Sequence, residues 1–405
     1  MAILRDNTNH SSASLLPLGL LNFFIYGTMV IFAAFFQLYL KDIGMDKFEI
    51  GSLMAVGPLV SLLAHPFWRR LSDRGQNLRF ILLIMMTGVL LMGHLVFKVD
   101  TFHMLYLSMI LLFFFQSPLL SQNNSLILGY IENTDQKFGT YRLWGSFGWT
   151  LVALTAGPII DSIGQHGISL LFSIMLMLGI GSALLLPPIQ LTTNTPAIRF
   201  TDIVRTLQNK TFIAFVIFGV LVSIPNSING IFMPLFISDL GGSRFQVGGA
   251  VFLSTIFEVL AFVLLERYLK QKMTYLMGCL TLVSLLFALR WELMSEASTP
   301  LQIIFIQVLH AVTFGGFFYV GTKLTALILP RPFRSSGQAV YTFALSGVSG
   351  IIAGFLGGWI FQSFGPVLLY KMGGSLTLLG AAGFGIMWYH IYKHENSSIE
   401  HHTEP

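Results

Sequence analysis

Apolar residues follow one another along most of this chain in runs of about twenty, separated by short clusters of charged residues, Pro and Gly. A helix rises about 1.5 Å per residue, so about 20 apolar residues cross the roughly 30 Å hydrocarbon core of a bilayer. The pattern therefore predicts an all-α membrane protein with twelve transmembrane helices, near residues 15–40, 48–68, 80–97, 102–129, 142–163, 167–187, 211–237, 246–266, 274–293, 301–325, 336–361 and 366–390.

Composition supports this prediction and excludes an ordinary soluble fold. Of the residues, 54% are hydrophobic and 10% are charged, whereas a soluble domain carries roughly 25% charged residues. The net charge of +5 would favour nucleic-acid binding in a soluble protein, but 17 of the 23 Lys and Arg residues fall in segments on the side of both termini. Because basic residues are retained in the cytoplasm, we expect a multi-pass protein of the cell membrane with both termini cytoplasmic and no nucleic-acid partner.

A polar stretch near the middle of the chain divides it into two halves. We expect an N-terminal six-helix half at 1–190, a cytoplasmic linker at 191–210, a C-terminal six-helix half at 211–395 and a polar tail at 396–405. A basic loop follows the second helix of each half, which is a weak internal repeat. Many secondary transporters use two similar halves to build a central site that opens alternately to either side of the membrane.

Three titratable side chains lie deep in consecutive predicted helices: Glu258, Arg290 and His310. A carboxylate about 12 Å inside a membrane helix must face a water-filled cavity, carry a proton or pair with a cation. We therefore interpret these residues as a proton-coupling group in which Glu258 alternates between a proton and an ion pair with Arg290. His310 would bind solute or pass the proton. The alternative is a static ion pair beside a hydrogen-bonded histidine.

A second set of candidate residues opens the predicted helix at 142–163. Arg142, Ser146 and Trp149 are four and seven residues apart, which places them on one helix face, and Gly145 beside them permits close helix contact. Arginine donates paired hydrogen bonds and an indole ring stacks on C–H surfaces, so the set suits a polyol or a carboxylate-bearing ring. The alternative is that Arg142 extends to the cytoplasmic boundary and Trp149 faces lipid.

Other polar side chains at membrane depth predict either a hydrophilic lumen or hydrogen bonds between helices. They are Asn22, Tyr26, Asn123, Asn124, Asn226, Asn229, Gln307, Gln338 and Tyr341. The candidate solute-binding residues are accordingly Arg142, Trp149, Ser146, Asn124, Asn226, Asn229, His310 and Tyr26.

The segment at 138–149 resembles the start of the fifth helix in the major facilitator superfamily, in the branch of lactose permease and the phenylpropionate-transporter-like proteins. The loop at 71–74, with Arg79 beyond it, is similar to the superfamily's signature between helices 2 and 3. The resemblance covers nearly the whole chain and implies the major facilitator fold. It places the permease's sugar-binding Arg at Arg142 and its stacking Trp at Trp149.

The resemblance extends to two of the deep titratable residues. A Gln-x-x-His segment on the tenth helix is similar to the permease's Lys-x-x-His, which implies a solute and coupling role for His310, and Arg290 corresponds to the arginine of the ninth helix. The chain departs from the permease where Thr313 replaces its proton-carrying Glu and where Asn226 and Asn229 replace two aspartates. The permease's lysine of the tenth helix and these acidic residues are thus replaced together, which avoids leaving a buried charge without a partner.

These features predict a secondary active transporter and not an enzyme, most simply a proton-coupled symporter of a sugar or sugar-like solute that works by alternating access. One alternative is proton-coupled uptake of an aromatic or other organic acid, because basic groups at depth outnumber the one carboxylate. Another is drug or metabolite efflux by antiport, because Gly157-Pro158 matches part of the antiporter signature. A membrane-embedded enzyme or receptor would need a catalytic or metal set or a soluble region, which the sequence lacks.

The remaining expectations concern energy coupling and partners. Asp73 and Arg74, in the loop between helices 2 and 3, are predicted to latch one conformation through ion pairs. A proton gradient is the expected energy source, with no cofactor and no metal site. The expected partners are a small-molecule solute, protons and the lipid bilayer, with no obligate protein partner.

Overall fold

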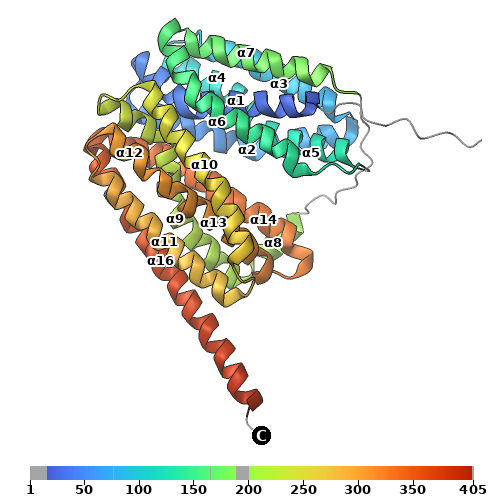
Figure 1. The fold of residues 1–405 in the computed structure, drawn as a ribbon, viewed down its shortest axis with the longest axis vertical. Helices are drawn as coiled ribbons and strands as arrows, with labels where there is room; N and C mark the ends of the chain where they lie inside the picture. The colour runs from blue at the N-terminus through green and yellow to red at the C-terminus, as the bar shows by residue number, and fades with distance from the viewer. Residues whose placement is uncertain (1–15, 76, 133, 165, 188–199, 404–405) are drawn as a thin grey trace, which may run out of the picture.

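The computed structural model describes residues 16–75, 77–132, 134–164, 166–187 and 200–403, which form two helical bundles (Figure 1). The first bundle contains α1 (Leu16–Asp42), α2 (Lys47–Gly75), α3 (Leu78–Val96), α4 (Phe102–Gln116), α5 (Leu119–Ile131), α6 (Phe138–Ile163) and α7 (Gly167–Leu184). The second contains α9 (Lys210–Asp239), α10 (Arg244–Tyr268), α11 (Met273–Ser295), α12 (Pro300–Ile306), α13 (Val308–Ile328), η1 (Arg331–Phe333), α14 (Arg334–Thr342), η2 (Phe343–Val348), α15 (Ser349–Ile352), η3 (Ala353–Gly357) and α16 (Gly358–Thr403).

Eleven stretches of the described chain are long and apolar enough to cross a membrane. The last of them, Arg331–Glu395, is 65 residues long and contains a non-helical Gly365 at φ 81°. Glycine adopts a positive φ at little steric cost, so the chain turns here and the stretch contains two crossings. The predicted all-α fold with twelve transmembrane helices is thereby confirmed.

Three of the predicted helices are interrupted. The helix expected at 102–129 breaks at Ser117 and Pro118, because proline lacks the N–H that would continue the helical bonding. The helix expected at 301–325 breaks between α12 and α13 at Gln307. The helix expected at 336–361 contains two π-helical segments, η2 and η3. Such segments insert an extra residue into a turn and occur frequently at functional sites.

The linker between the bundles contains a short helix, α8 (Phe200–Leu207), which packs against α14 of the second bundle. The hydroxyls of Thr206 and Ser336 are 2.9 Å apart and hydrogen-bonded. At the other end of the chain, the segment expected as a polar tail continues α16 as far as Thr403 (Figure 1).

The two bundles meet at the end away from the linker and diverge toward it (Figure 1). α10 packs against α6, and α2 packs against η3 and α16. Glycine permits close backbone contact here, because a Cβ at Gly248 would overlap the carbonyl of Ala153 and one at Gly354 would overlap that of Gly51. We call the joined end the closed face and the opposite end the linker face.

Ion pairs join the two bundles at the closed face. Each of these closed-face ion pairs links one residue of the first bundle to one of the second, so together they stabilise the arrangement that is joined at this end. The pairs are Lys41–Asp239 at 2.8 Å, Lys47–Asp239 at 2.7 Å, Arg244–Asp42 and Arg244–Asp161.

We expect Asp239→Asn to shift the protein toward a conformation that closes the linker face. The substitution removes two partly exposed ion pairs, which together contribute up to about 1 kcal/mol, so the ratio of the two conformations should change about fivefold. Spin labels at Gly139→Cys and Ser335→Cys, both exposed at the linker face, in a Cys279→Ser background, measure the distance between the bundles. The variant should gain a shorter distance.

The control for this experiment is Glu296→Gln, which breaks the Lys371–Glu296 pair within the second bundle. It removes one carboxylate and one ion pair but no link between the bundles. An equal change in the distance distribution of both variants would contradict a latching role for the closed-face ion pairs.

Close contact between α1 and α6 depends on Gly148, because a Cβ there would overlap the Phe23 carbonyl. We expect Gly148→Leu to separate the two helices and to destabilise the protein by about 1 to 3 kcal/mol, the usual cost of overpacking. Thermal unfolding in detergent measures this loss. The control is Gly181→Ala on α7, where nothing lies within 4 Å of an added Cβ; an equally large loss there would argue against the close contact.

Candidate functional site

The guanidinium of Arg142, one turn into α6, is exposed and contacts Tyr26 of α1. Its Nη1 donates a hydrogen bond to the Tyr26 hydroxyl, and its Cζ lies 5.1 Å from the centroid of the Tyr26 ring. Gly145 makes the contact possible, since a Cβ there would meet the Tyr26 ring at 2.6 Å. The structure thus brings together two predicted solute-binding residues and shows why glycine stands between α1 and α6.

Glu258 lies on α10, which packs against α6 of the first bundle and α13 of the second. Its side chain is half-buried, and Arg142 is close enough to interact with the carboxylate electrostatically. On its other side Glu258 packs close to Gly315 of α13, where an added Cβ would make an ordinary van der Waals contact of 3.5 Å with the Glu258 Cγ. An arginine of one bundle and a carboxylate of the other are therefore within electrostatic range of each other.

Arg290 of α11 is fully buried, and its hydrogen-bond partners are neutral. Its Nη2 donates to the Gln307 side-chain oxygen at 2.5 Å, and its Nη1 donates to the Thr313 hydroxyl at 3.4 Å. Its Cζ lies 4.6 Å from the centroid of the Trp291 ring. The expected ion pair between Glu258 and Arg290 is absent among the described residues, because the hydrogen-bond partners of Arg290 are side chains of α13 and of the break before it.

His310 contributes to the same buried network. Its Nδ1 lies 3.1 Å from the Nη1 of Arg290, and its ring stacks on Phe314 with centroids 4.9 Å apart. Since a guanidinium only donates hydrogen bonds, the Nδ1 atom must accept, so the proton of the neutral ring is on Nε2. That Nε2–H is the group His310 has available for a solute hydroxyl or a water molecule.

Some of the amide side chains join helices through hydrogen bonds, and some have buried oxygens without a partner. Asn123 donates to the Asn22 oxygen at 2.9 Å and joins α5 to α1. Asn229 donates to the Gln307 oxygen at 3.2 Å and accepts from the Tyr370 hydroxyl at 3.2 Å, so it extends the Arg290 network. The side-chain oxygens of Asn123, Asn124 and Asn226 are buried and have no hydrogen-bond partner among the described residues.

Three predicted groups receive less support from the structure. Trp149 is half-buried on the α6 face that carries Arg142. Ser146 is half-buried as well, and its carbonyl accepts a hydrogen bond from the Thr150 hydroxyl. The side chains of the predicted latch residues Asp73 and Arg74 lie outside the described part of the chain. Within that part, no group of three or more His, Cys, Asp or Glu residues is arranged to hold a metal ion.

The model of the MFS_1 like family matches residues 15–372. The chain belongs to the MFS_1 like family. It is therefore a multi-pass membrane transporter of the major facilitator superfamily and not an enzyme, as its relatives are also transporters. The sequence resemblance to this superfamily is confirmed.

Three curated relatives cover nearly the whole chain. The uncharacterized transporter YwbF of Bacillus subtilis (strain 168) is 26% identical over 374 residues, which are 89% of each chain. The maltose permease of Geobacillus stearothermophilus is 23% identical over 88% of this chain and 90% of its own. The probable 3-phenylpropionic acid transporter of Escherichia coli (strain K12) is 26% identical over 86% of this chain and 91% of its own.

Among solved structures, the nucleoside transporter NupG superposes with a TM-score of 0.80 at 17% identity, over 92% of this chain and 98% of its own. At this identity the likeness supports the fold, and it agrees with the two bundles described above.

The structure adds residues that sequence reasoning did not select. Tyr370 has no signal of its own in the sequence, because its importance comes from its hydrogen bond to Asn229. The closed-face ion pairs had a weak signal, since Lys41, Lys47 and Arg244 lie on the side that is poor in basic residues.

Proposed function

We propose that the protein is a proton-coupled symporter of a neutral, sugar-like solute, which binds between Arg142 and Glu258. The observation that carries the proposal is the placement of these two residues on α6 and α10, in opposite bundles and within electrostatic range of each other. Because the two charges offset each other, the site favours a neutral solute over an ion. A relative named maltose permease adds support.

The donors and acceptors match a polyol. The Arg142 guanidinium donates hydrogen bonds to solute oxygens in a fixed fork, the Glu258 carboxylate accepts from hydroxyl groups, and the indole of Trp149 provides an apolar face for a sugar ring. Solute bound by both bundles would favour the state in which they approach each other, as alternating access requires.

Glu258 is the proposed proton carrier. It is half-buried at membrane depth, where a carboxylate must face water, carry a proton or pair with a cation. In the proposed cycle, a proton on Glu258 permits the bundles to separate without leaving an unpaired carboxylate in the low-dielectric interior. Release of this proton restores the negative charge of Glu258 and its attraction to Arg142.

The test is uptake of labelled solutes into proteoliposomes with an imposed pH gradient. We expect a sugar or glycoside to accumulate when the external medium is the more acidic, and accumulation to stop when a protonophore dissipates the gradient. Uptake that is the same with and without the gradient would reject proton coupling, and uptake confined to charged solutes would reject the neutral site.

A second candidate is uptake of an organic acid. Arg290 has no carboxylate partner among the described residues, so its charge could be balanced by the carboxylate of a solute. A relative named a probable 3-phenylpropionic acid transporter favours this reading. Competition decides between them: 3-phenylpropionate should inhibit labelled sugar uptake weakly if the neutral site is correct, and glycosides should inhibit labelled acid uptake weakly if the acid site is correct.

A further inference from the structure

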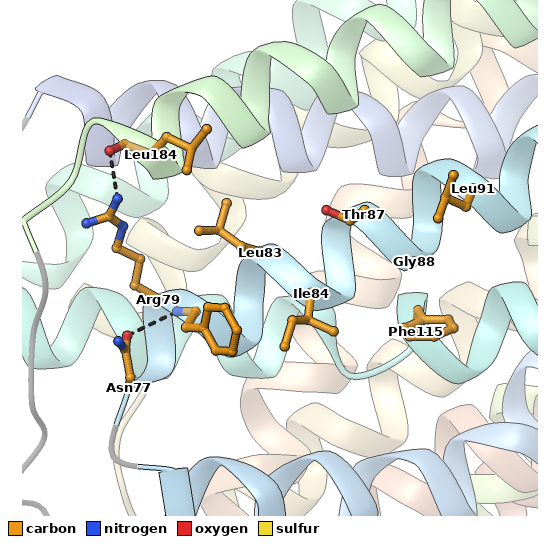
Figure 2. Close-up of a pocket in the computed structure, with 10 residues that line it drawn as sticks. Asn77, Arg79, Leu83, Ile84, Thr87, Gly88, Leu91, Phe115 and Leu184 are labelled. Carbon is orange, nitrogen blue, oxygen red and sulfur yellow. Dashed lines mark hydrogen bonds between the residues drawn. The ribbon is translucent and has the colours of Figure 1, made fainter.

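A groove of about 720 Å³ lies on the outer surface of the first bundle, and none of its lining residues belongs to the candidate solute site (Figure 2). Leu83, Ile84, Thr87 and Leu91 line it along α3. The remaining lining residues are Asn77, Arg79, Phe80, Gly88, Phe115 and Leu184.

The groove has a smooth apolar floor. Leu91 is 59% exposed and Ile84 37%, so both present hydrocarbon outward from a helix that spans the membrane. Gly88 allows the ring of Phe115 to pack directly on α3, because a Cβ at this position would overlap that ring. A chain of methylene groups fits such a surface, and a hydrated solute does not, since its polar groups would find no partners there.

The length of the groove corresponds to one leaflet. Arg79 and Leu91 are twelve residues apart on one helix, which is a rise of about 18 Å, and half of a hydrocarbon core is about 15 Å. With Arg79 at the linker face, Leu91 lies near the middle of the bilayer. The groove therefore runs from the headgroup region to the midplane.

Arg79 gives the outer end of the groove a positive charge. Its Nη2 donates to the carbonyl of Leu184 at 2.7 Å, which fixes the guanidinium at the end of α7 (Figure 2). Its Nε has no hydrogen-bond partner among the described residues. None of the residues lining the groove is acidic, so no lining residue offsets the positive charge of the guanidinium.

We propose that this groove binds an anionic phospholipid of the leaflet at the linker face, with its phosphate on Arg79 and one acyl chain along Leu83, Ile84 and Leu91. Arginine matches phosphate in charge and in its paired hydrogen bonds. The excess of Lys and Arg predicts that the linker face is cytoplasmic, and anionic lipids are concentrated in the cytoplasmic leaflet. The proposal does not depend on which solute is transported.

Native mass spectrometry of the delipidated protein tests this site. The protein is titrated with phosphatidylglycerol or with phosphatidylcholine of the same acyl chains, and the bound lipid is counted. We expect phosphatidylglycerol to bind about tenfold more tightly to the unmodified protein. Arg79→Gln should lower its affinity to that of phosphatidylcholine, whereas Arg70→Gln, which removes an exposed charge from α2 outside the groove, should have no such effect.

Ile84→Trp provides an independent measurement, because it leaves Arg79 intact and fills the apolar part of the groove. It should weaken the binding of both lipids. Equal affinity of the two lipids for the unmodified protein would overturn the proposal, and so would an Arg70→Gln effect as large as that of Arg79→Gln. Glycerol phosphate, which has no acyl chains, should fail to displace the lipid; displacement at equal concentration would show a free phosphate site instead.

Discussion

Glu258→Gln is expected to abolish accumulation of solute against its gradient while leaving the exchange of solute across the membrane intact. Glutamine keeps the size and the hydrogen-bonding oxygen of glutamate but cannot carry a transferable proton. For one proton per solute, a pH difference of one unit supports a concentration ratio of about ten. That ratio should fall to about one in the variant.

The measurement compares two assays on the same proteoliposomes: uptake driven by an imposed pH gradient, and exchange of labelled for unlabelled solute at equal pH. Glu266→Gln is the matched control, since it makes the same chemical change two turns further along α10, at an exposed position. Full accumulation by Glu258→Gln would remove this residue from the coupling mechanism, and equal losses in both variants would point to a general effect of charge.

Arg142→Lys is expected to raise the half-saturating solute concentration about 10- to 100-fold. Lysine retains the positive charge beside Glu258 but not the planar fork, so the paired hydrogen bonds to the solute are lost. Hydrogen bonds to a charged donor contribute about 1.5 to 3 kcal/mol. The variant should fold, because Tyr26 can still accept a hydrogen bond from the ammonium group.

Solute-dependent thermal stabilisation of the purified protein measures this affinity without requiring transport. Arg70→Lys serves as the control, since it makes the same change at an exposed position on α2. An Arg142→Lys variant that binds solute as tightly as the unmodified protein would show that Arg142 only positions Tyr26. The Tyr26→Phe variant would then carry the larger loss.

The sequence predicted the helical crossings well because each depends on local hydrophobicity. The breaks inside them differ in cause. The interruption at Pro118 follows from a local rule about proline, which a prediction from hydrophobicity alone does not include. The interruption at Gln307 accompanies hydrogen bonds from Arg290 and Asn229. A side chain that accepts from two other helices cannot be recognised from its neighbours in sequence.

Local spacing along one helix also predicted part of the candidate site. Spacing along α6 correctly grouped Arg142 with Gly145, because both lie on one helix face that meets α1. The partner of Glu258 could not be derived in this way. It depends on how the second bundle sits against the first, to which Gly248 contributes through its close contact with Ala153, a residue distant in sequence.

The closed-face ion pairs have side chains that are between about a quarter and two fifths exposed, so dissolved salt reaches them. The screening length of water shortens from about 30 Å at 0.01 M salt to about 3 Å at 1 M. Dilute medium strengthens the attraction that holds this end together, and concentrated brine weakens it. The resting orientation of the transporter is thus set partly by the ionic strength of the solution bathing that surface, even before any solute arrives.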